Sequence, residues 1–322
     1  MPNEPQQPDK TTPSESQRSQ VEHPPDSKEK AVPFSPQCSA TAPQYPEQFV
    51  FAIGKLDVRF PSIGLEREFH RCAKMSGGLA SLPRGERLRK VFEANHHLAP
   101  RVAYLLCIAG VPAFVLTPTT PQARATILES LSQIDSSDHW VLIVGRQGPM
   151  CGPSDCGGLL VPMVACDQIY TFSVAEWSKN LEDVLKPALQ AKKTDPATLS
   201  RSAIELFNQM VSSMQNIGAT DPHRALNFVL MRHPGLFLAV AERAAKASFD
   251  KVETRAIHGL GTRRVLAVIL TFRDLATGVP ERVFCRIDVT EEWPFLSDQP
   301  DGSPAPLGLL PFIENDLMGA AF

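Results

Sequence analysis

Apolar and polar positions recur with two different periods in the first half of the chain, which predicts strands interrupted by helices. The stretch "EQFVFAIGKLDVRFP" (residues 47–61) is rich in apolar, β-branched and aromatic residues and favours a strand. The next stretch, "GLEREFHRCAKM" (64–75), is typical of a helix. A β-hairpin is indicated by "RVAYLLCIAGVPAFVLTP" (101–118), with its Ala-Gly-Val-Pro segment near the turn.

A helix with a well-marked start follows this hairpin. Thr120 is placed to cap it, and Pro121 occupies the first helical position, where a proline costs no hydrogen bond. Its apolar residues recur at helical spacing and form one stripe: Ala123, Ile127, Leu131 and Ile134. Two buried strands, 139–145 and 158–172, then flank a loop rich in glycine and proline, and a helix is expected at 173–188.

The second half of the chain indicates helices followed by strands. A helix is predicted at 196–217 with Gly218 as its terminator, and two more are predicted at 222–232 and 234–248. Residues 263–290 alternate along both arms around a Thr-Gly-Val-Pro turn, which predicts an antiparallel hairpin. Because there is no sustained strand–helix–strand rhythm, the predicted class is α+β, with two packed subdomains of helices and mixed or antiparallel sheets.

Composition changes this picture at the N-terminus. Ten of the 29 prolines lie in residues 1–46, among Gln, Ser, Glu and Lys. Such a segment cannot bury enough apolar surface to offset its ordering entropy, so we expect a disordered Pro-rich arm there. The remaining parts are expected to be an N-terminal α+β subdomain (47–190), a C-terminal subdomain of helices and a hairpin (195–297), and a tail (298–322).

Charge and cysteine usage narrow the class of protein. The net charge of −3 gives no global attraction to nucleic acid or to an anionic membrane. No apolar run is long enough for a transmembrane helix, and the N-terminus lacks the basic-then-apolar order of a secretory signal. The seven cysteines are odd in number and widely scattered, unlike a disulfide framework, which favours the reducing cytoplasm.

Residues 218–234, "GATDPHRALNFVLMRHP", concentrate polar side chains at the start of a predicted helix. Asp221 is interpreted as the helix cap, because an Asp-Pro pair also opens the preceding helix. His223 and Asn227 lie four residues apart on one helical face, with Arg224 adjacent. These three side chains form either a structural polar network or a surface that orients a ligand.

The loop "GRQGPMCGPSDCGGLLVP" is a second candidate site, because loops held by rigid strands often carry function. Arg146 and the loop amides have the chemistry to hold a carboxylate or a phosphate. Cys151 and Cys156 form a C-x4-C pair and are the candidate zinc ligands, although a structural zinc site needs a second pair at comparable spacing. The favoured interpretation is that both cysteines are small buried hydrophobes and that no cofactor is bound.

The stretch "DQIYTF" is a third candidate site. Asp167 and Gln168, with Tyr170, follow a buried apolar run, and polar groups at the end of a strand are well placed to bind a ligand. The alternative is that Asp167 caps a turn while Tyr170 and Phe172 enter the core. The residues alone leave both interpretations open.

Four stretches in the same order resemble one known family: "FAIGKLDVRFPSIGLEREF", "GPSDCGGLLVPMVACDQIYTF", "GATDPHRALNFVLMRHP" and "RIDVTEEWPFL". They are similar to the C-terminal domain of the patellamide-type cyanobactin maturation proteases, over about residues 47–297. That domain accompanies enzymes that modify and cyclise ribosomally made peptides. It is a domain of unknown function, so the resemblance implies no catalytic residue, and this chain lacks the subtilisin-like domain.

The resemblance implies a non-catalytic binding or scaffold module in the biosynthesis of ribosomal peptide natural products. Its partners would be a precursor peptide or a peptide-modifying enzyme, with no nucleic acid and no membrane, and C2 pairing makes a homodimer the expected assembly. The alternative is an enzyme that acts on peptides through Asp167, His223, Arg224 and Asn227. That alternative requires the four side chains to meet in one pocket.

Overall fold

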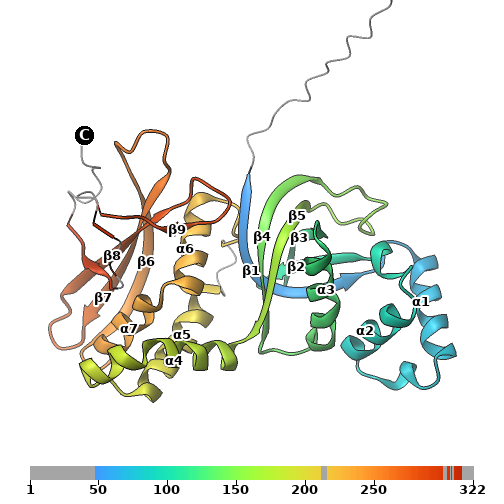
Figure 1. Ribbon diagram of the computed structural model, residues 1–322, viewed down its shortest axis with the longest axis horizontal. Coiled ribbons are helices and arrows are strands. Elements are labelled where there is room, and N and C mark those ends of the chain that lie inside the picture. The colour runs from blue at the N-terminus through green and yellow to red at the C-terminus, as the bar shows by residue number, and fades with distance from the viewer. Residues whose placement is uncertain (1–47, 212–215, 300–302, 305, 307, 314–322) are drawn as a thin grey trace, which may run out of the picture. The chain divides into compact units, whose positions relative to one another are not determined.

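The computed structural model describes residues 48–211, 216–299, 303–304, 306 and 308–313 (Figure 1). The predicted disordered arm, 1–46, lies outside these residues. The described elements are helices and two sheets, which confirms the α+β class.

Five strands close into a barrel in the order β1-β2-β3-β5-β4. All pairings are antiparallel except that of β3 with β5, and helix α3 (Pro121–Ser130) connects β3 to β4. This strand order, with one parallel pair and a helix between the third and fourth strands, is that of the OB-fold barrel. The strands are β1 (Phe49–Arg59), β2 (Ala103–Ile108), β3 (Val111–Pro118), β4 (His139–Met150) and β5 (Pro162–Ser173).

Strand β1 closes the barrel because it pairs with two partners in turn. Its first half pairs with β4 as far as Gly54, and its second half pairs with β2 from Lys55 onward. A Cβ atom on Gly54 would lie 2.6 Å from the Cys107 carbonyl oxygen. A glycine is therefore required where β1 passes from one partner to the other.

The long β1–β2 connection and helix α3 fill one end of the barrel. Helices α1 (Ile63–Met75) and α2 (Arg84–Ala94) bury an apolar stripe in the same core as α3 and the barrel interior. The predicted cap of α3 is confirmed, because the Thr120 hydroxyl accepts a hydrogen bond from the Ala123 amide and Pro121 begins the helix. Figure 1 shows these helices at the β2–β3 side of the barrel.

The rest of the described chain forms four helices and a second sheet of order β10-β8-β7-β6, with β9 paired to β8. The predicted hairpin is confirmed as β7 and β8, and Leu310–Pro311 of the tail pairs with β8. The elements are α4 (Val174–Lys192), α5 (Pro196–Val211), α6 (Asp221–Arg232), α7 (Pro234–Arg243), β6 (Ala247–Ile257), β7 (Val265–Asp274), β8 (Pro280–Asp288), β9 (Phe295–Leu296) and β10 (Leu310–Pro311).

Three local predictions in this half are wrong. Thr220, not Asp221, caps α6, because its hydroxyl accepts from the His223 amide while Asp221 is the first helical residue. The helix predicted to reach residue 217 is described only to Val211, and Asn216 and Ile217 are not helical. Helix α7 ends at Arg243, because strand β6 begins where the helix was expected to continue.

The barrel and the second half share a core. Phe51 and Ile53 of β1 and Leu142 and Val144 of β4 point away from the barrel interior and pack in the same cluster as α4–α7, β7 and β8. The Phe51 amide also donates to the Gly218 carbonyl at 2.9 Å. The described residues from 48 onward accordingly form one compact unit, so the expected division between 190 and 195 lies inside it and remains a prediction.

Candidate functional site

A cleft of about 680 Å³ lies on the barrel surface over β2 and β3. One wall is the end of the β1–β2 connection, including His96 and the short helix η2 (Ala99–Arg101), and the other is the β4–β5 loop. Strand β3 and helix α3 supply the remaining walls. The residues that line the cleft include His96, Arg101, Val115, Thr117, Arg124, Asp155 and Met163.

The floor of the cleft is apolar. Val115 is buried and Met163 half-buried, and both belong to a small cluster on the outer face of β2, β3 and β5. Tyr104 also lines the cleft, but its side chain is buried and its hydroxyl donates to the Ala99 carbonyl at 2.9 Å. Its ring is therefore a structural support of the cleft and does not offer a free stacking face.

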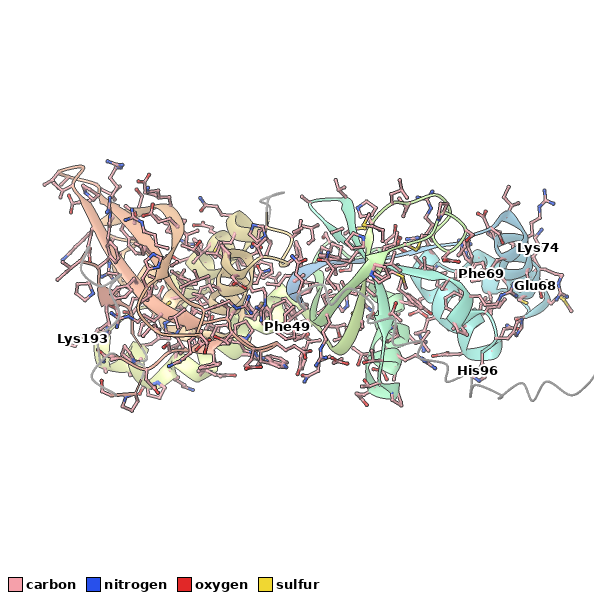
Figure 2. All side chains as sticks on the ribbon, turned by 90° about the horizontal axis from the view of Figure 1, so that it is seen from above. Phe49, Glu68, Phe69, Lys74, His96 and Lys193 are labelled. Atoms are coloured by element: carbon pink, nitrogen blue, oxygen red, sulfur yellow. A yellow bond between two sulfur atoms is a disulfide. The ribbon has the colours of Figure 1, made fainter. Side chains whose placement is uncertain are left out.

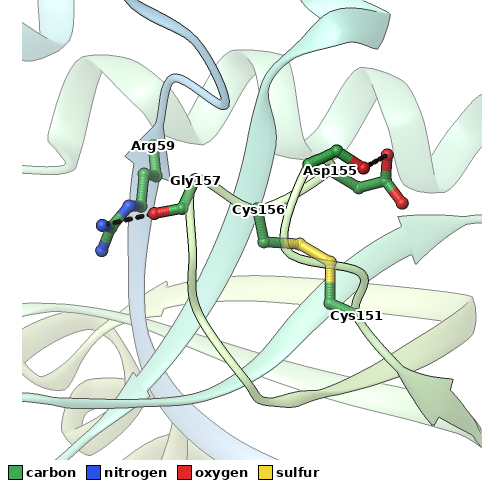
Figure 3. Close-up of a disulfide and its surroundings, with 6 residues drawn as sticks. Arg59, Cys151, Asp155, Cys156 and Gly157 are labelled. Carbon is green, nitrogen blue, oxygen red and sulfur yellow. Dashed lines mark hydrogen bonds between the residues drawn. A yellow bond between two sulfur atoms is a disulfide. The ribbon is translucent and has the colours of Figure 1, made fainter.

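The β4–β5 loop, residues 151–161, covers part of the same barrel face. Cys151 and Cys156 are joined by a disulfide, and both are buried against Ala103 and Val115 (Figure 3). The Arg59 guanidinium donates to the Gly157 carbonyl at 2.8 Å, which ties the loop to the end of β1. The disulfide therefore closes the loop on itself, and the Arg59 hydrogen bond holds it to the end of β1.

The disulfide corrects two predictions about these cysteines. The sulfurs bond to each other and so do not serve as zinc ligands, and they are buried as predicted but are not free thiols. Among the described residues, no three His, Cys, Asp or Glu side chains gather into a metal-binding group. Cys107 packs against the same cluster as a free thiol, and burial, aided by Asp57, raises its pKa to about 11.

The rim of the cleft carries more positive than negative charge. Arg101 and Arg124 are exposed, and no acidic side chain within the described ranges pairs with either guanidinium. Asp155 is the acidic residue among the lining side chains, and its carboxylate accepts from the Ser154 hydroxyl at 3.3 Å. His96 is also exposed at the rim, at the α2 end of the barrel (Figure 2).

The structure places the other predicted site residues elsewhere. Arg146 lies in β4, with its guanidinium 3.5 Å from the Glu292 carboxylate and over the Phe49 ring. Asp167 lies within β5 and not at a strand end, and its carboxylate accepts from the Thr119 hydroxyl at 2.6 Å.

Asp167 also shares a hydrogen bond with Glu292. Burial, reinforced by the neighbouring Asp167 carboxylate, raises the pKa of Glu292 against the opposing effect of Arg146. None of these three residues lines the cleft.

Tyr170 and Gln168 form a surface pair on β5. The Tyr170 hydroxyl donates to the Gln168 side chain, and the Tyr170 ring packs edge-on against Trp293 at 6.2 Å. Tyr170 is 39% exposed, so the interpretation that it enters the core is wrong, whereas Phe172 packs on Phe207 in the core as that interpretation expected. This surface lies apart from the cleft.

The polar face of α6 forms a structural network. Arg224, 1% exposed, donates to the Val289, Glu291 and Glu292 carbonyls. Asn227 donates to the Phe51 carbonyl at 2.9 Å and accepts from the Asn216 side chain. Arg224 thus ties α6 to the segment after β8, and Asn227 ties α6 to the barrel.

His223 is half-buried near the start of α6, and burial lowers its pKa. Of the four residues of the predicted enzyme site, Asp167 and Arg224 both contact Glu292, one at its carboxyl group and the other at its backbone carbonyl, whereas Asn227 contacts Phe51. None of the four, His223 included, lines the cleft over β2 and β3. The geometry gives that alternative no support.

Comparison with known proteins places this architecture in a family. The family model described as the PatG Domain matches residues 49–262, which include the whole barrel, helices α4–α7 and strand β6. The chain belongs to the PatG domain family. The residues that line the cleft, from Pro61 to Met163, all lie within the matched range.

A solved structure described as "PatG Domain of Unknown Function" is similar to this PatG domain. The two chains are 18% identical with a TM-score of 0.59, and the match covers 78% of this chain and 97% of the other. At this identity the likeness shows the fold alone. No curated protein matches the chain. Within the described part of this PatG domain, no helix has the length and apolar character of a membrane span.

Two residues that matter at the cleft, Arg101 and Arg124, were not candidates in the sequence. Each is an exposed arginine in an ordinary local context, one at the start of a predicted hairpin and one in a predicted helix. The only available signal was the length of the two connections that end at the cleft, since long loops on a rigid scaffold often bind ligands.

Proposed function

We propose that this PatG domain is a non-catalytic module that binds a peptide segment in the cleft over β2 and β3. The observation that supports it is the position of the cleft: it lies between the β1–β2 and β4–β5 connections of a barrel with OB strand order. In OB-fold proteins this face and these two loops bind oligonucleotides and oligosaccharides, which are extended polymers as an unfolded peptide is. The match between this face and the ligand-binding face of OB-fold proteins is an analogy, whereas the cleft is a feature of this domain itself.

The size and chemistry of the cleft suit a peptide. Its volume of about 680 Å³ lies within the range of about 300–1,000 Å³ that is typical of ligand sites. An apolar floor with hydroxyl, guanidinium and carboxylate groups on its rim offers burial to side chains and hydrogen bonds to a polar backbone. Thr117 and Ser154 supply the hydroxyl groups.

The same chemistry argues against an oligonucleotide. Single-stranded nucleic acids bind OB barrels by stacking bases on exposed aromatic rings. The single aromatic residue among the lining residues is Tyr104, whose side chain is buried. The chain as a whole carries a net charge of −3, which does not favour binding to a phosphate backbone.

The family resemblance supports a role for such a module alongside enzymes that process ribosomally made peptides. We therefore propose that the peptide is a precursor of that kind, or a segment of a peptide-modifying enzyme, and that the domain brings the two together. A C2 homodimer would present two such clefts to the same partner.

A binding measurement with a blocked cleft tests the proposal. Fluorescently labelled linear peptides are titrated with the protein and followed by anisotropy. Thr117 is exposed on β3 at the cleft, so Thr117→Trp fills the cleft without entering the core and should abolish binding.

A matched substitution controls for a nonspecific effect of the added ring. Glu205 is exposed on α5 and lines a different cavity, between α5, α7 and β6, so Glu205→Trp should leave binding unchanged. The proposal fails if peptides do not bind, or if both variants bind them as well as the native protein does.

A further inference from the structure

Arg101 and Arg124 differ from many arginines of this chain in having no acidic partner. Arg84 pairs with Asp57 at 2.6 Å, Arg243 with Glu281 at 2.6 Å, Arg264 with Asp221 at 3.0 Å and Arg273 with Asp250 at 3.1 Å. In the described part of the chain, no carboxylate lies within ion-pair distance of Arg101 or Arg124. These two guanidinium groups come from separate elements, η2 and α3, and line the same cleft.

The positive charge of the cleft contrasts with the charge of the whole chain. Two arginines oppose one aspartate among its lining residues, whereas the chain has a net charge of −3. Asp155 forms no ion pair with either arginine among the described residues, and its carboxylate accepts a hydrogen bond from the Ser154 hydroxyl. An unpaired guanidinium group beside an apolar floor is a typical arrangement for binding a carboxylate.

We propose that the peptide bound by this cleft is acidic, and that Arg101 and Arg124 are the residues that select it. This inference rests on the proposed function and names its ligand class. Carboxylate oxygens of Asp or Glu side chains accept hydrogen bonds from the two guanidinium groups. Apolar neighbours in the peptide pack on Val115, Met163 and the disulfide.

Planar guanidinium groups fit this role better than an ammonium group would. Each offers a fixed fork of N–H donors that matches the two oxygens of a carboxylate. A phosphate is the other anion with this geometry. A nucleotide polymer would also need stacking surfaces, and no exposed Phe, Tyr or Trp ring is among the residues that line the cleft.

Two peptides that differ only in charge test the inference. One is a labelled, end-blocked peptide that carries glutamates among leucine and valine residues, and the other has each glutamate replaced by glutamine. The acidic peptide should bind the native full-length protein roughly ten to a hundred times more tightly than its glutamine twin. The double variant Arg101→Gln/Arg124→Gln should remove this preference.

Two further variants separate charge at the cleft from charge elsewhere. Arg201 is exposed on α5, outside the cleft and without a partner among the described residues, so Arg201→Gln should bind like the native protein. Asp155→Asn removes the negative charge from the rim and should tighten binding of the acidic peptide by roughly twofold to threefold. Equal thermal midpoints of all variants show that the folded state is retained.

The outcomes distinguish the two levels of the proposal. If both peptides bind equally well, and Thr117→Trp alone blocks them, the acidic preference is overturned and peptide binding stands. If neither peptide binds, the proposed function itself is overturned. Binding of a labelled oligothymidylate that depends on Arg101 and Arg124, without binding of the acidic peptide, would overturn the inference in favour of a phosphate ligand.

Discussion

Gly218 and Gly278 share a left-handed backbone conformation and differ in their surroundings. Gly218 has φ of +75° and lies against β1, where a Cβ atom would be 2.5 Å from the Phe51 carbonyl oxygen and 2.6 Å from Ala52. Gly278 has φ of +70° in the β7–β8 turn, and a Cβ atom there would meet nothing within 4 Å. The first glycine permits close contact between the barrel and the second half, and the second only permits a turn.

Alanine substitution should separate these two requirements. Gly278→Ala carries only the strain of a left-handed conformation, so we expect it to lower the free energy of unfolding by about 1–2 kcal/mol. Gly218→Ala adds a clash with rigid backbone and should cost clearly more than that. Urea unfolding of both variants measures the difference. Equal losses would show that β1 and residue 218 do not make this close contact.

His233 is a buried histidine between two helices. It is 1% exposed, ends α6 and precedes α7, and burial lowers the pKa of its side chain to about 4. The folded protein therefore holds the neutral form, whereas the unfolded chain takes up a proton below about pH 6.5. Its Nε2 atom is buried without a hydrogen-bond partner in the described structure. No acceptor there would offset the cost of burying the charged form of the ring.

This shift gives stability a defined pH dependence. Between about pH 6.5 and pH 4 the unfolded state binds more protons than the folded state does. The contribution of neutral His233 to the free energy of unfolding is therefore complete above about pH 6.5. It falls by up to about 3 kcal/mol as the pH is lowered to about 4. Unfolding of the native protein and of His233→Gln across this range isolates the contribution. The loss should be smaller in the variant, and identical pH profiles would contradict the prediction.

At the scale of elements, the β4–β5 loop carries both the disulfide and one wall of the cleft. Cys151 and Cys156 are five positions apart, so the bond closes a short loop that is tied to β1 through Arg59. A crosslink over so short a span removes modest entropy from the unfolded chain. Its larger effect is to fix the conformation of the loop, whose two cysteines pack against Ala103 of β2 and Val115 of β3.

Removing the disulfide should increase the mobility of this loop and lower the free energy of unfolding only modestly. We expect Cys151→Ala/Cys156→Ala to lower the free energy of unfolding by about 2 kcal/mol and to speed amide exchange in residues 151–161. Reductant should have the same effect on the native protein and no further effect on the variant, which serves as its control. Unchanged exchange in the loop would mean that its apolar contacts suffice to hold it.

At the scale of the whole molecule, the barrel is completed by the helices of the second half. The outward faces of β1 and β4 contribute Phe51, Ile53, Leu142 and Val144 to the core that contains α4–α7. Hydrogen bonds from side chains to the backbone cross the same contact: the Gln48 amide group donates to the Ala219 carbonyl, and the Asn227 amide group donates to the Phe51 carbonyl. The predicted subdomains therefore depend on each other for burial.

This shared core predicts cooperative unfolding. Residues 45–322 should unfold in a single transition by circular dichroism and by tryptophan fluorescence, because neither half can bury its side of the contact alone. A fragment that ends at residue 192 would expose the apolar face of β1 and β4, and it should bind a hydrophobic dye and lack a cooperative transition. Two separate transitions in the longer chain would contradict this.

Local chemistry made several elements predictable. Thr120 followed by Pro121 marks the start of α3, and the Ala109-Gly110 turn marks the β2–β3 hairpin, where both residues adopt positive φ. Strand β6 was missed because it is an edge strand with exposed charged residues such as Asp250 and Lys251, which hide the apolar alternation.

The sequence by itself determined the class of the fold, the positions of most helices and strands, and the family resemblance, because these depend on residues close together in the chain. Only the tertiary structure decided that β1 pairs with both β2 and β4, that Arg224 and Asn227 are structural, and that Arg101 and Arg124 line one cleft. These facts depend on contacts between residues distant in sequence. Many pairings satisfy the same local periodicity, and the burial of a common core selects among them.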